Sequence, residues 1–226
     1  MHSSTKPPEA SHNFSTWQHI FTWAQAHYRD RSFNKDEQIP ARPGLLYLVE
    51  KGAIRLVGTA NDSDSKNPQN QKLEEAFLGF VGISQPFEIV THSPFTLQAY
   101  AHVEQTKVVW MYWHDLDNWP EFRREVLDAF RYQHQRKLLW LSTLGQRRTI
   151  DRLLGFITLL VEEYGESTPH GHCLPYPLTH AQIGSAIGST RVTVTRLMGK
   201  LRQQGLIAIE EDNLICLPSV YIPSGN

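Results

Sequence analysis

Residues 178–217 read LTHAQIGSAIGSTRVTVTRLMGKLRQQGLIAIEEDNLICL. Thr179 is a good N-cap residue, and the segment from Ala181 to Ile187 places Ile183 and Ile187 four residues apart on one face of a short helix. Gly188 follows, and glycine permits the backbone geometry of a tight turn. The first half of this stretch therefore predicts a short helix that ends in a turn.

A second helix follows the turn. Ser189 or Thr190 can cap it, and it extends from about Thr190 to Gln203. Its inward positions are apolar, and its outward positions are Arg, Thr and Lys. LIAIEEDNLICL then alternates around a Glu-Asp-Asn turn, which predicts a β-hairpin, or wing. A short helix, a glycine turn, a second helix and a wing form a winged helix-turn-helix.

The outward face of the second helix has the chemistry of the DNA major groove. Arg191 and Arg196 can each offer two parallel hydrogen bonds to guanine O6 and N7, worth about 1–3 kcal/mol of base discrimination. We expect phosphate contacts from hydroxyl and ammonium groups around them: Ser189, Thr190, Thr193, Thr195 and Lys200. The alternative is a solvated face on a packing helix, but the preceding helix, the turn and the wing all favour the DNA-binding geometry.

A long helix precedes this region. EFRREVLDAFRYQHQRKLLWLSTLG has no Gly or Pro before its last residue, and its apolar positions form a seam along one face. At about 1.5 Å per residue it extends past about 30 Å, and long seamed helices often pair as dimers. The expected interface residues are Phe122, Val126, Phe130, Leu138 and Leu141. The alternative is a helix that lies across its own β domain.

The first half of the chain has a different texture. Residues 33–113 contain short apolar runs separated by Gly, Pro and Asn/Asp clusters, which is typical of an antiparallel sheet, sandwich or barrel. Helical spacing from Phe14 to Tyr28 predicts a short amphipathic helix before it. We therefore expect an α+β protein with a flexible tail at 1–12, a β-barrel domain at 13–118, a dimerisation helix at 119–145 and a winged-helix domain at 146–226.

Composition limits the function classes. The chain has 226 residues with a formal net charge of −1, so nucleic-acid affinity must come from a local basic face. Arg and Lys crowd 123–152 and 191–202. No apolar run approaches a membrane span, and no signal peptide begins the chain, so we expect a cytoplasmic protein without membrane association. Cys173 and Cys216 could pair only if the fold brings them together, and we expect both to be ordinary buried apolar residues.

The order of β-rich domain, long helix and winged helix resembles the family of the cyclic-AMP receptor protein and the fumarate-nitrate regulator (CRP/FNR). Gly188-Ser-Thr-Arg-Val-Thr-Val-Thr-Arg-Leu197 is most similar to the recognition helix of its cyanobacterial nitrogen-regulator branch. The resemblance implies base contacts from Arg191, Val192 and Arg196, and phosphate contacts from Thr190 and Thr193. It also implies a parallel homodimer on a pseudo-palindromic DNA site, with RNA polymerase as a further partner.

The sensory half departs from the cyclic-nucleotide binders of that family, which carry Phe-Gly-Glu and a later Arg before Ser or Thr. The matching stretches here read Gln85-Pro-Phe-Glu-Ile-Val90 and Thr96-Leu-Gln-Ala99, without the Gly and without the Arg. A buried phosphate without its guanidinium is strongly disfavoured, which argues against cyclic AMP. Two cysteines are too few for an iron–sulfur sensor. The effector stays unidentified, although Arg131 and Arg136 could meet a carboxylate if they are not solvated or paired.

Two other constellations have ordinary explanations. His170-Gly-His172-Cys173 has the ligand types of a zinc or copper site, but no second cluster accompanies it, so we expect a solvent loop and no metal. Trp110, Tyr112, Trp113 and Trp119 could form a ligand cage, but aromatic residues more often belong to a core. No phosphate loop, nucleophile elbow or HExxH motif is present, so we expect no cofactor and no enzyme.

Two other functions are compatible with the sequence. A ligand-binding module could use its winged helix for a protein contact, and it would show no duplex affinity at low salt. A metal-dependent enzyme built on a β-barrel would hold stoichiometric metal and depend on His170 and His172.

Overall fold

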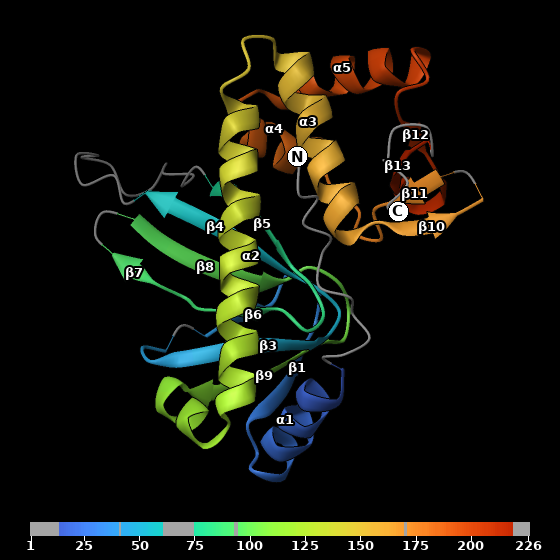
Figure 1. Ribbon diagram of the computed structural model, residues 1–226. Helices are drawn as coiled ribbons and strands as arrows, with labels where there is room; N and C mark the ends of the chain where they lie inside the picture. Colours follow the sequence, from blue (N-terminus) through green and yellow to red (C-terminus); the bar gives the residue numbers. More distant parts are fainter. Residues whose placement is uncertain (1–13, 41, 61–74, 93–94, 170, 219–226) are drawn as a thin grey trace, which may run out of the picture.

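The computed structural model describes residues 14–40, 42–60, 75–92, 95–169 and 171–218. A β-rich domain, a long helix and a smaller helical domain with its own sheet follow one another along the chain (Figure 1). The predicted tail at 1–12 lies outside the described residues. The expected α+β order of antiparallel β domain, long helix and winged helix is confirmed.

The β domain consists of two antiparallel sheets. One has the order β1-β9-β3-β6, from strands Asp30–Phe33, Thr106–Tyr112, Leu45–Lys51 and Pro86–Phe87. The other has the order β2-β8-β4-β5, from strands Gln38–Ile39, Phe95–Ala101, Ile54–Ala60 and Glu75–Val81, with β7 (Thr91–His92) paired to β8. The described strands thus form two sheets around a shared core and not the closed barrel that the sequence suggested.

Alternation of side chains builds the core between these sheets. Tyr47 and Val49 of β3 meet Ile54 of β4 and Ala99 of β8 in one buried cluster. Because successive side chains of a strand point to opposite faces, the other face of β3 is free to contact a second layer. Leu46 and Leu48 on that face are fully buried against helix α1 (Phe14–Ala26) and the long helix α2 (Pro120–Leu144).

The long helix α2 runs along most of the molecule, from the 3-10 helix η1 (Trp113–Asn118) to the second domain (Figure 1). Its first turns belong to the protein's own core, because Phe122 and Val126 have no exposed surface and pack with Trp17 and Ile20 of α1. The prediction that Phe122 and Val126 lie in a dimer interface is therefore wrong. The helix lies across its own β domain at this end, as the alternative interpretation had it.

The second domain begins with helix α3 (Thr149–Tyr164) and continues with the hairpin β10 (Glu166–Thr168) and β11 (Gly171–Cys173). Helices α4 (His180–Ile187) and α5 (Arg191–Gln203) follow. A second hairpin closes the domain, with strands β12 (Ala208–Ile209) and β13 (Ile215–Leu217) joined through the 3-10 helix η2 (Glu211–Asn213). The four strands form one antiparallel sheet of order β10-β11-β13-β12.

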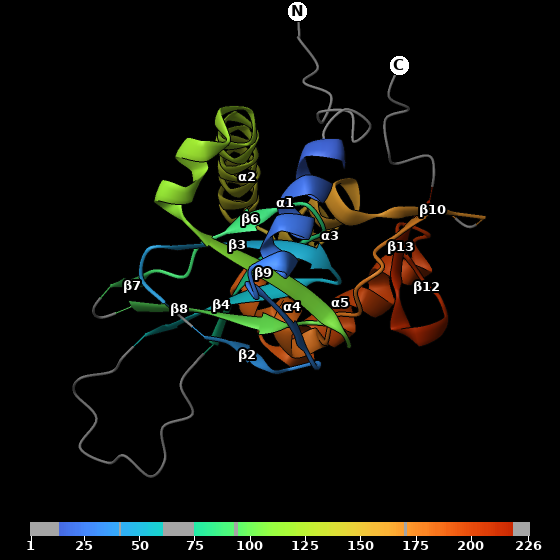
Figure 2. The same ribbon diagram turned by 90° about the horizontal axis from the view of Figure 1, so that it is seen from below.

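The two domains share hydrophobic packing. Phe77 and Phe80 of β5 belong to the same buried cluster as Phe156 of α3, Ile183 of α4 and Val194 of α5. Viewed from below, α4 lies close to strand β4 and the sheet that contains it (Figure 2). The winged-helix domain is therefore held against the edge strand β5 and is not connected through α2 alone.

Among the described residues, no helix is both long enough and apolar enough to cross a membrane.

Candidate nucleic-acid interface

The helix-turn-helix is fixed by local interactions that the sequence predicted. Thr179 caps α4: its hydroxyl accepts a hydrogen bond from the backbone N–H of Gln182 at 3.2 Å, while the backbone N–H of Thr179 donates to Oε1 of Gln182 at 2.9 Å. Such a reciprocal pair is a capping box. Gly188 ends α4 with φ 62° and ψ 51°, a left-handed conformation that L side chains adopt only with strain.

Helix α5 starts at the predicted place. Thr190 caps it, because its hydroxyl accepts from the N–H of Thr193 at 3.2 Å. Val194, Met198 and Leu201 are buried in the domain core, as their spacing predicted. The opposite face is therefore set toward solvent.

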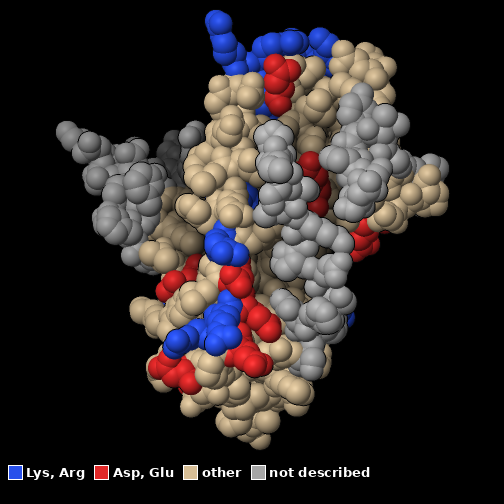
Figure 3. All heavy atoms as spheres, in the orientation of Figure 1, with Lys and Arg blue, Asp and Glu red and all other residues tan. Residues whose placement is uncertain are grey.

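The outward side chains are those proposed to read DNA. Arg191 and Arg196 are exposed, and Val192 is 78% exposed although it is apolar. Thr195 lies one turn from Arg191, and its hydroxyl donates to the Arg191 carbonyl at 2.9 Å and meets Nδ1 of His180 at 2.8 Å. Lys200 is also exposed, whereas Ser189 and Thr193 are half-buried at the start of the helix. Figure 3 shows Lys and Arg gathered at the end of the molecule where α5 lies.

The wing carries a disulfide that sequence reasoning did not expect. Ala208 pairs with Cys216, and Cys216 pairs on its other side with Cys173 of β11, so the two cysteines face each other across neighbouring strands. Their sulfurs form the bond Cys173–Cys216, which links residues 43 apart. The prediction that both are unpaired apolar residues is wrong, although both are buried. The pairing of β11 with β13 is a long-range contact that no local sequence pattern predicts.

Arg152 of α3 joins the helix-turn-helix to the connection between α2 and α3. Its guanidinium donates to the carbonyl of Ile187 at 3.2 Å and to the carbonyl of Gln146 at 3.1 Å. A third bond reaches Oγ1 of Thr149 at 3.1 Å. One side chain thus holds the end of α4 beside the end of α2. Sequence reasoning missed this role, because nothing local distinguishes Arg152 from other helical arginines.

Along α2, several large apolar side chains are left exposed by the described part of the chain. Leu138 is 51% exposed and Leu141 is 63% exposed, and Leu127 and Leu139 are about as open, at 54% and 50%. Phe130 is only partly buried, against Trp113 with ring centroids 5.9 Å apart. Several exposed leucines on one helix are typical of a surface that binds another protein chain.

Polar side chains bind backbone groups of β5 at the junction between the domains. On the edge strand β5, the N–H of Phe77 donates to Oγ of Ser185 at 2.8 Å, and Ser185 donates to the carbonyl of Glu75 at 2.6 Å. Lys137 of α2 donates to another carbonyl of the same strand, that of Leu78. Helices α4 and α2 therefore satisfy backbone groups that an edge strand would leave open to solvent.

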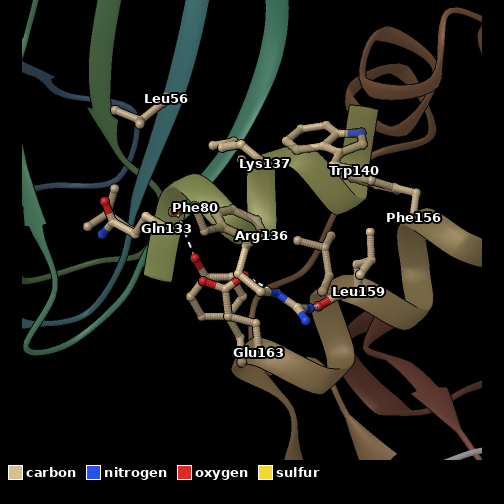
Figure 4. A pocket seen from close by; sticks show the side chains of 13 residues that line it. Leu56, Phe80, Gln133, Arg136, Lys137, Trp140, Phe156, Leu159 and Glu163 are labelled. Atoms are coloured by element: carbon tan, nitrogen blue, oxygen red, sulfur yellow. Dashed lines mark hydrogen bonds and ion pairs between the residues drawn. The ribbon is translucent and has the colours of Figure 1, made fainter. Parts of the chain in front are cut away.

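Lys137 also borders a small cavity of about 50 Å³ between β5, α2 and α3 (Figure 4). Burial lowers the pKa of Lys137 to about 8, and the charge of Glu163 opposes that shift. Gly79 makes room for it: a Cβ there would lie 2.8 Å from Nζ of Lys137 and 3.2 Å from the Trp140 ring. In Figure 4, Arg136 extends from α2 toward Leu159 and Glu163 of α3.

The arginines considered for an effector are paired within the chain. Arg136 contacts carboxylates of Glu162 and Glu163, each at 3.3 Å, and donates to the Leu159 carbonyl at 2.5 Å. Arg131 meets Asp128 at 3.2 Å on the surface. The interpretation of these arginines as paired residues is confirmed.

The aromatic and histidine clusters have structural explanations. Trp113 and Trp119 pack against the core beside α1, and Trp110 packs against the core between the sheets, while Tyr112 is 44% exposed. His170 lies outside the described residues. The Cys173 thiol is used by the disulfide, and no group of three or more His, Cys, Asp or Glu suited to a metal occurs in the described ranges.

Comparison with known proteins agrees with this geometry. Residues 147–220 match the family model of the Crp-like helix-turn-helix domain. The chain is 40% identical over 175 residues to a global nitrogen regulator of Synechocystis sp., covering 75% of this chain and 74% of that protein. It is 38% identical over 188 residues to the global nitrogen regulator of Nostoc sp., covering 80% and 81%. The match to the Synechococcus elongatus protein, at 37% identity, spans 43% of that relative's length.

Solved structures share the fold at low identity. A cyclic nucleotide-binding domain containing protein from Listeria monocytogenes superposes with a TM-score of 0.71 at 12% identity, covering 91% of this chain and 99% of that one. A transcriptional regulator of the CRP family from Thermus thermophilus superposes with a TM-score of 0.60 at 20% identity, covering 83% and 91%. These similarities extend over the β domain, the long helix and the winged helix together.

Proposed function

This chain belongs to the CRP/FNR family of DNA-binding transcription regulators, and from this premise we propose that it reads a pseudo-palindromic DNA site as a homodimer. Each α5 enters a major groove, and the two half-sites lie about 34 Å apart. One observation carries the proposal: α4 supports α5 so that Arg191, Val192 and Arg196 project into solvent. Cytoplasmic location and contact with RNA polymerase complete the proposed role.

The proposed contacts divide by chemistry. Arg191 and Arg196 have the planar donors that guanine edges accept, and Val192 offers an apolar surface for a thymine methyl. Ser189, Thr190, Thr193, Thr195 and Lys200 surround them with hydroxyl and ammonium donors for phosphates. The start of α5 adds partial positive charge from its unpaired N–H groups.

Selection of bound duplexes from a random library tests this function, with purified protein as bait. We expect a two-fold related consensus. Arg196→Ala should then relax the preference at one symmetric base pair, whereas Lys200→Ala should weaken binding equally on all sequences. No enrichment at low salt would instead favour a winged helix used for protein contacts.

The second copy is proposed to cover the open leucines of α2. Leu138 and Leu141 each expose more than half of their surface, and pairing with a second α2 would bury them. Leu138→Glu with Leu141→Glu should convert the dimer to a monomer in sedimentation and reduce operator affinity. An unchanged sedimentation coefficient would contradict the proposal that these leucines form the dimer interface.

We also propose that cyclic AMP is not the effector. Where the cyclic-nucleotide binders carry an arginine, followed by Ser or Thr and then Ala, the chain has Leu97, followed by Gln98 and Ala99. An uncharged aliphatic side chain cannot neutralise a cyclic phosphate. Cyclic AMP should therefore leave the affinity for the selected duplex unchanged, and tighter binding in its presence would contradict the proposal.

A further inference from the structure

The connection between α2 and α3 lies beside the turn of the helix-turn-helix. Arg152 bonds the carbonyl of Gln146 at 3.1 Å and the carbonyl of Ile187 at 3.2 Å. Because one guanidinium binds both carbonyls, the connection that follows Gln146 lies near the turn at Gly188. The connection therefore sits next to the start of α5, and both lie at the same end of the molecule in Figure 1.

Two neighbouring arginines occupy this connection. Arg147 and Arg148 are both exposed. Arg148 has one weak neighbour, Asp151 at 3.7 Å, with side chains 71% and 47% exposed, and Arg147 has no ion pair within the described part of the chain. Exposed pairs of this kind contribute little, so both guanidinium charges are available to a partner.

These charges join the basic surface of α5. Figure 3 shows Lys and Arg along the end of the molecule formed by α5 and the α2–α3 connection, with a small acidic area between them. The other cations of this surface are Arg191, Arg196, Lys200 and Arg202, all exposed. The positive surface is thus wider than the recognition helix.

A basic surface that continues past the base-reading side chains fits the phosphate backbone of the same duplex. Arginine binds phosphate oxygens with two parallel hydrogen bonds, and phosphate contacts position a protein without reading sequence. Resting on the proposed function, we propose that Arg147 and Arg148 contact DNA phosphates beside each half-site, so that the footprint extends beyond the helix-turn-helix.

Salt dependence of binding tests this proposal. Affinity of the full-length protein for its selected duplex is measured by fluorescence anisotropy over a series of KCl concentrations. Each lost phosphate contact should reduce the slope of log affinity against log salt by about 0.9, so Arg147→Ala with Arg148→Ala should reduce it by about 3 to 4 in a dimer. Base preference should not change, because no base contact is removed.

Two matched variants complete the experiment. Arg123→Ala with Arg124→Ala removes the same charge from the first turns of α2, about 35 Å away along the helix, and should keep the wild-type slope. Arg147→Lys with Arg148→Lys retains the charge and should keep most of the slope. Circular dichroism confirms that each variant is folded.

The outcomes separate the inference from the proposed function. If the wild type binds its duplex and the Arg147/Arg148 alanine variant keeps the wild-type slope, the extended footprint is wrong while the regulator remains. A slope lost equally in the Arg123/Arg124 control would also overturn it, since net charge alone would then account for the effect. If the wild type binds no duplex, the proposed function fails first.

Discussion

The recognition surface and the domain junction use their cations in opposite ways. On α5, Arg191 and Arg196 are exposed and left open for a ligand. At the junction, Lys137 is half-buried against the Leu78 carbonyl, and Arg136 is paired with Glu162 and Glu163. Basic side chains on the same protein are thus available for recognition where they are solvated, and they hold the fold together where they are paired within the chain.

The two regions also differ in the sequence separation of the residues that hold them together. The helix-turn-helix is built from neighbours in sequence, such as Thr179 with Gln182 and Thr190 with Thr193. The junction is built from residues far apart, such as Phe77 with Ser185 and His102 with Pro177. Changes at the junction should therefore alter how the winged-helix domain is held, and changes in the caps should alter α4 and α5 themselves.

The largest expected effect on stability is reduction of Cys173–Cys216. The disulfide closes a loop of 43 residues, and loop-closure entropy for that length corresponds to about 4 kcal/mol of unfolding free energy at most. Urea unfolding with and without a dithiol reductant should show a lower midpoint after reduction. Cys173→Ser with Cys216→Ser should be insensitive to reductant. Identical midpoints for the oxidised and reduced wild type would show that the wing does not depend on this bond.

A smaller effect should follow from pH through His102. Its ring is buried, and its Nε2 meets the Pro177 carbonyl at 2.8 Å between the domains. Burial lowers the pKa of His102 from 6.5 to about 4, and the Pro177 carbonyl opposes that shift. Between these values the unfolded chain binds the proton and the folded chain does not.

The contribution of His102 to the free energy of unfolding is therefore present in full above pH 6.5. It is lost as the pH falls toward 4, by up to about 3 kcal/mol. Urea unfolding across this range measures the loss. His102→Gln keeps a donor for Pro177 but does not titrate, so its stability should depend less on pH. Equal pH dependence in both proteins would contradict the assignment to His102.

The smallest effect distinguishes the two regions most sharply. Ser185→Ala removes the partner of the Phe77 N–H, and Thr179→Ala removes the partner of the Gln182 N–H. Each substitution should lower the free energy of unfolding by about 1 kcal/mol, since water can replace part of the lost hydrogen bond.

Hydrogen exchange at these two amides separates the effects. Faster exchange at Phe77 is expected only in Ser185→Ala, and faster exchange at Gln182 only in Thr179→Ala. If either variant accelerates both amides equally, the junction and the helix-turn-helix open as one unit and the distinction is wrong.

These two regions also differ in how far sequence predicts them. The N-cap at Thr179, the turn at Gly188 and the buried face with Val194 follow from spacing within a few residues, and the structure confirms them. The long helix was predicted for the same reason, but not which end of it is buried. Phe122 and Leu141 look alike in the apolar seam, but α1 and the β domain cover the first and leave the second exposed.

Long-range pairing explains the remaining differences. Cys173 and Cys216 become partners because β11 lies next to β13, and Ser185 becomes a partner of β5 because α4 packs on that strand. Neither contact has a periodicity or a spacing that could reveal it. The roles assigned to Arg191, Val192 and Arg196 in base reading stay predictions until DNA is bound.

Discrimination between the selected duplex and a scrambled duplex tests the central claim most directly, with both affinities measured at one salt concentration. The wild type should prefer its selected duplex by about 1,000-fold or more. Arg191→Ala with Arg196→Ala should reduce that preference by at least about 100-fold, because each lost guanine contact removes about 1–3 kcal/mol of discrimination. A double variant that keeps the full preference would show that these two arginines do not read the bases.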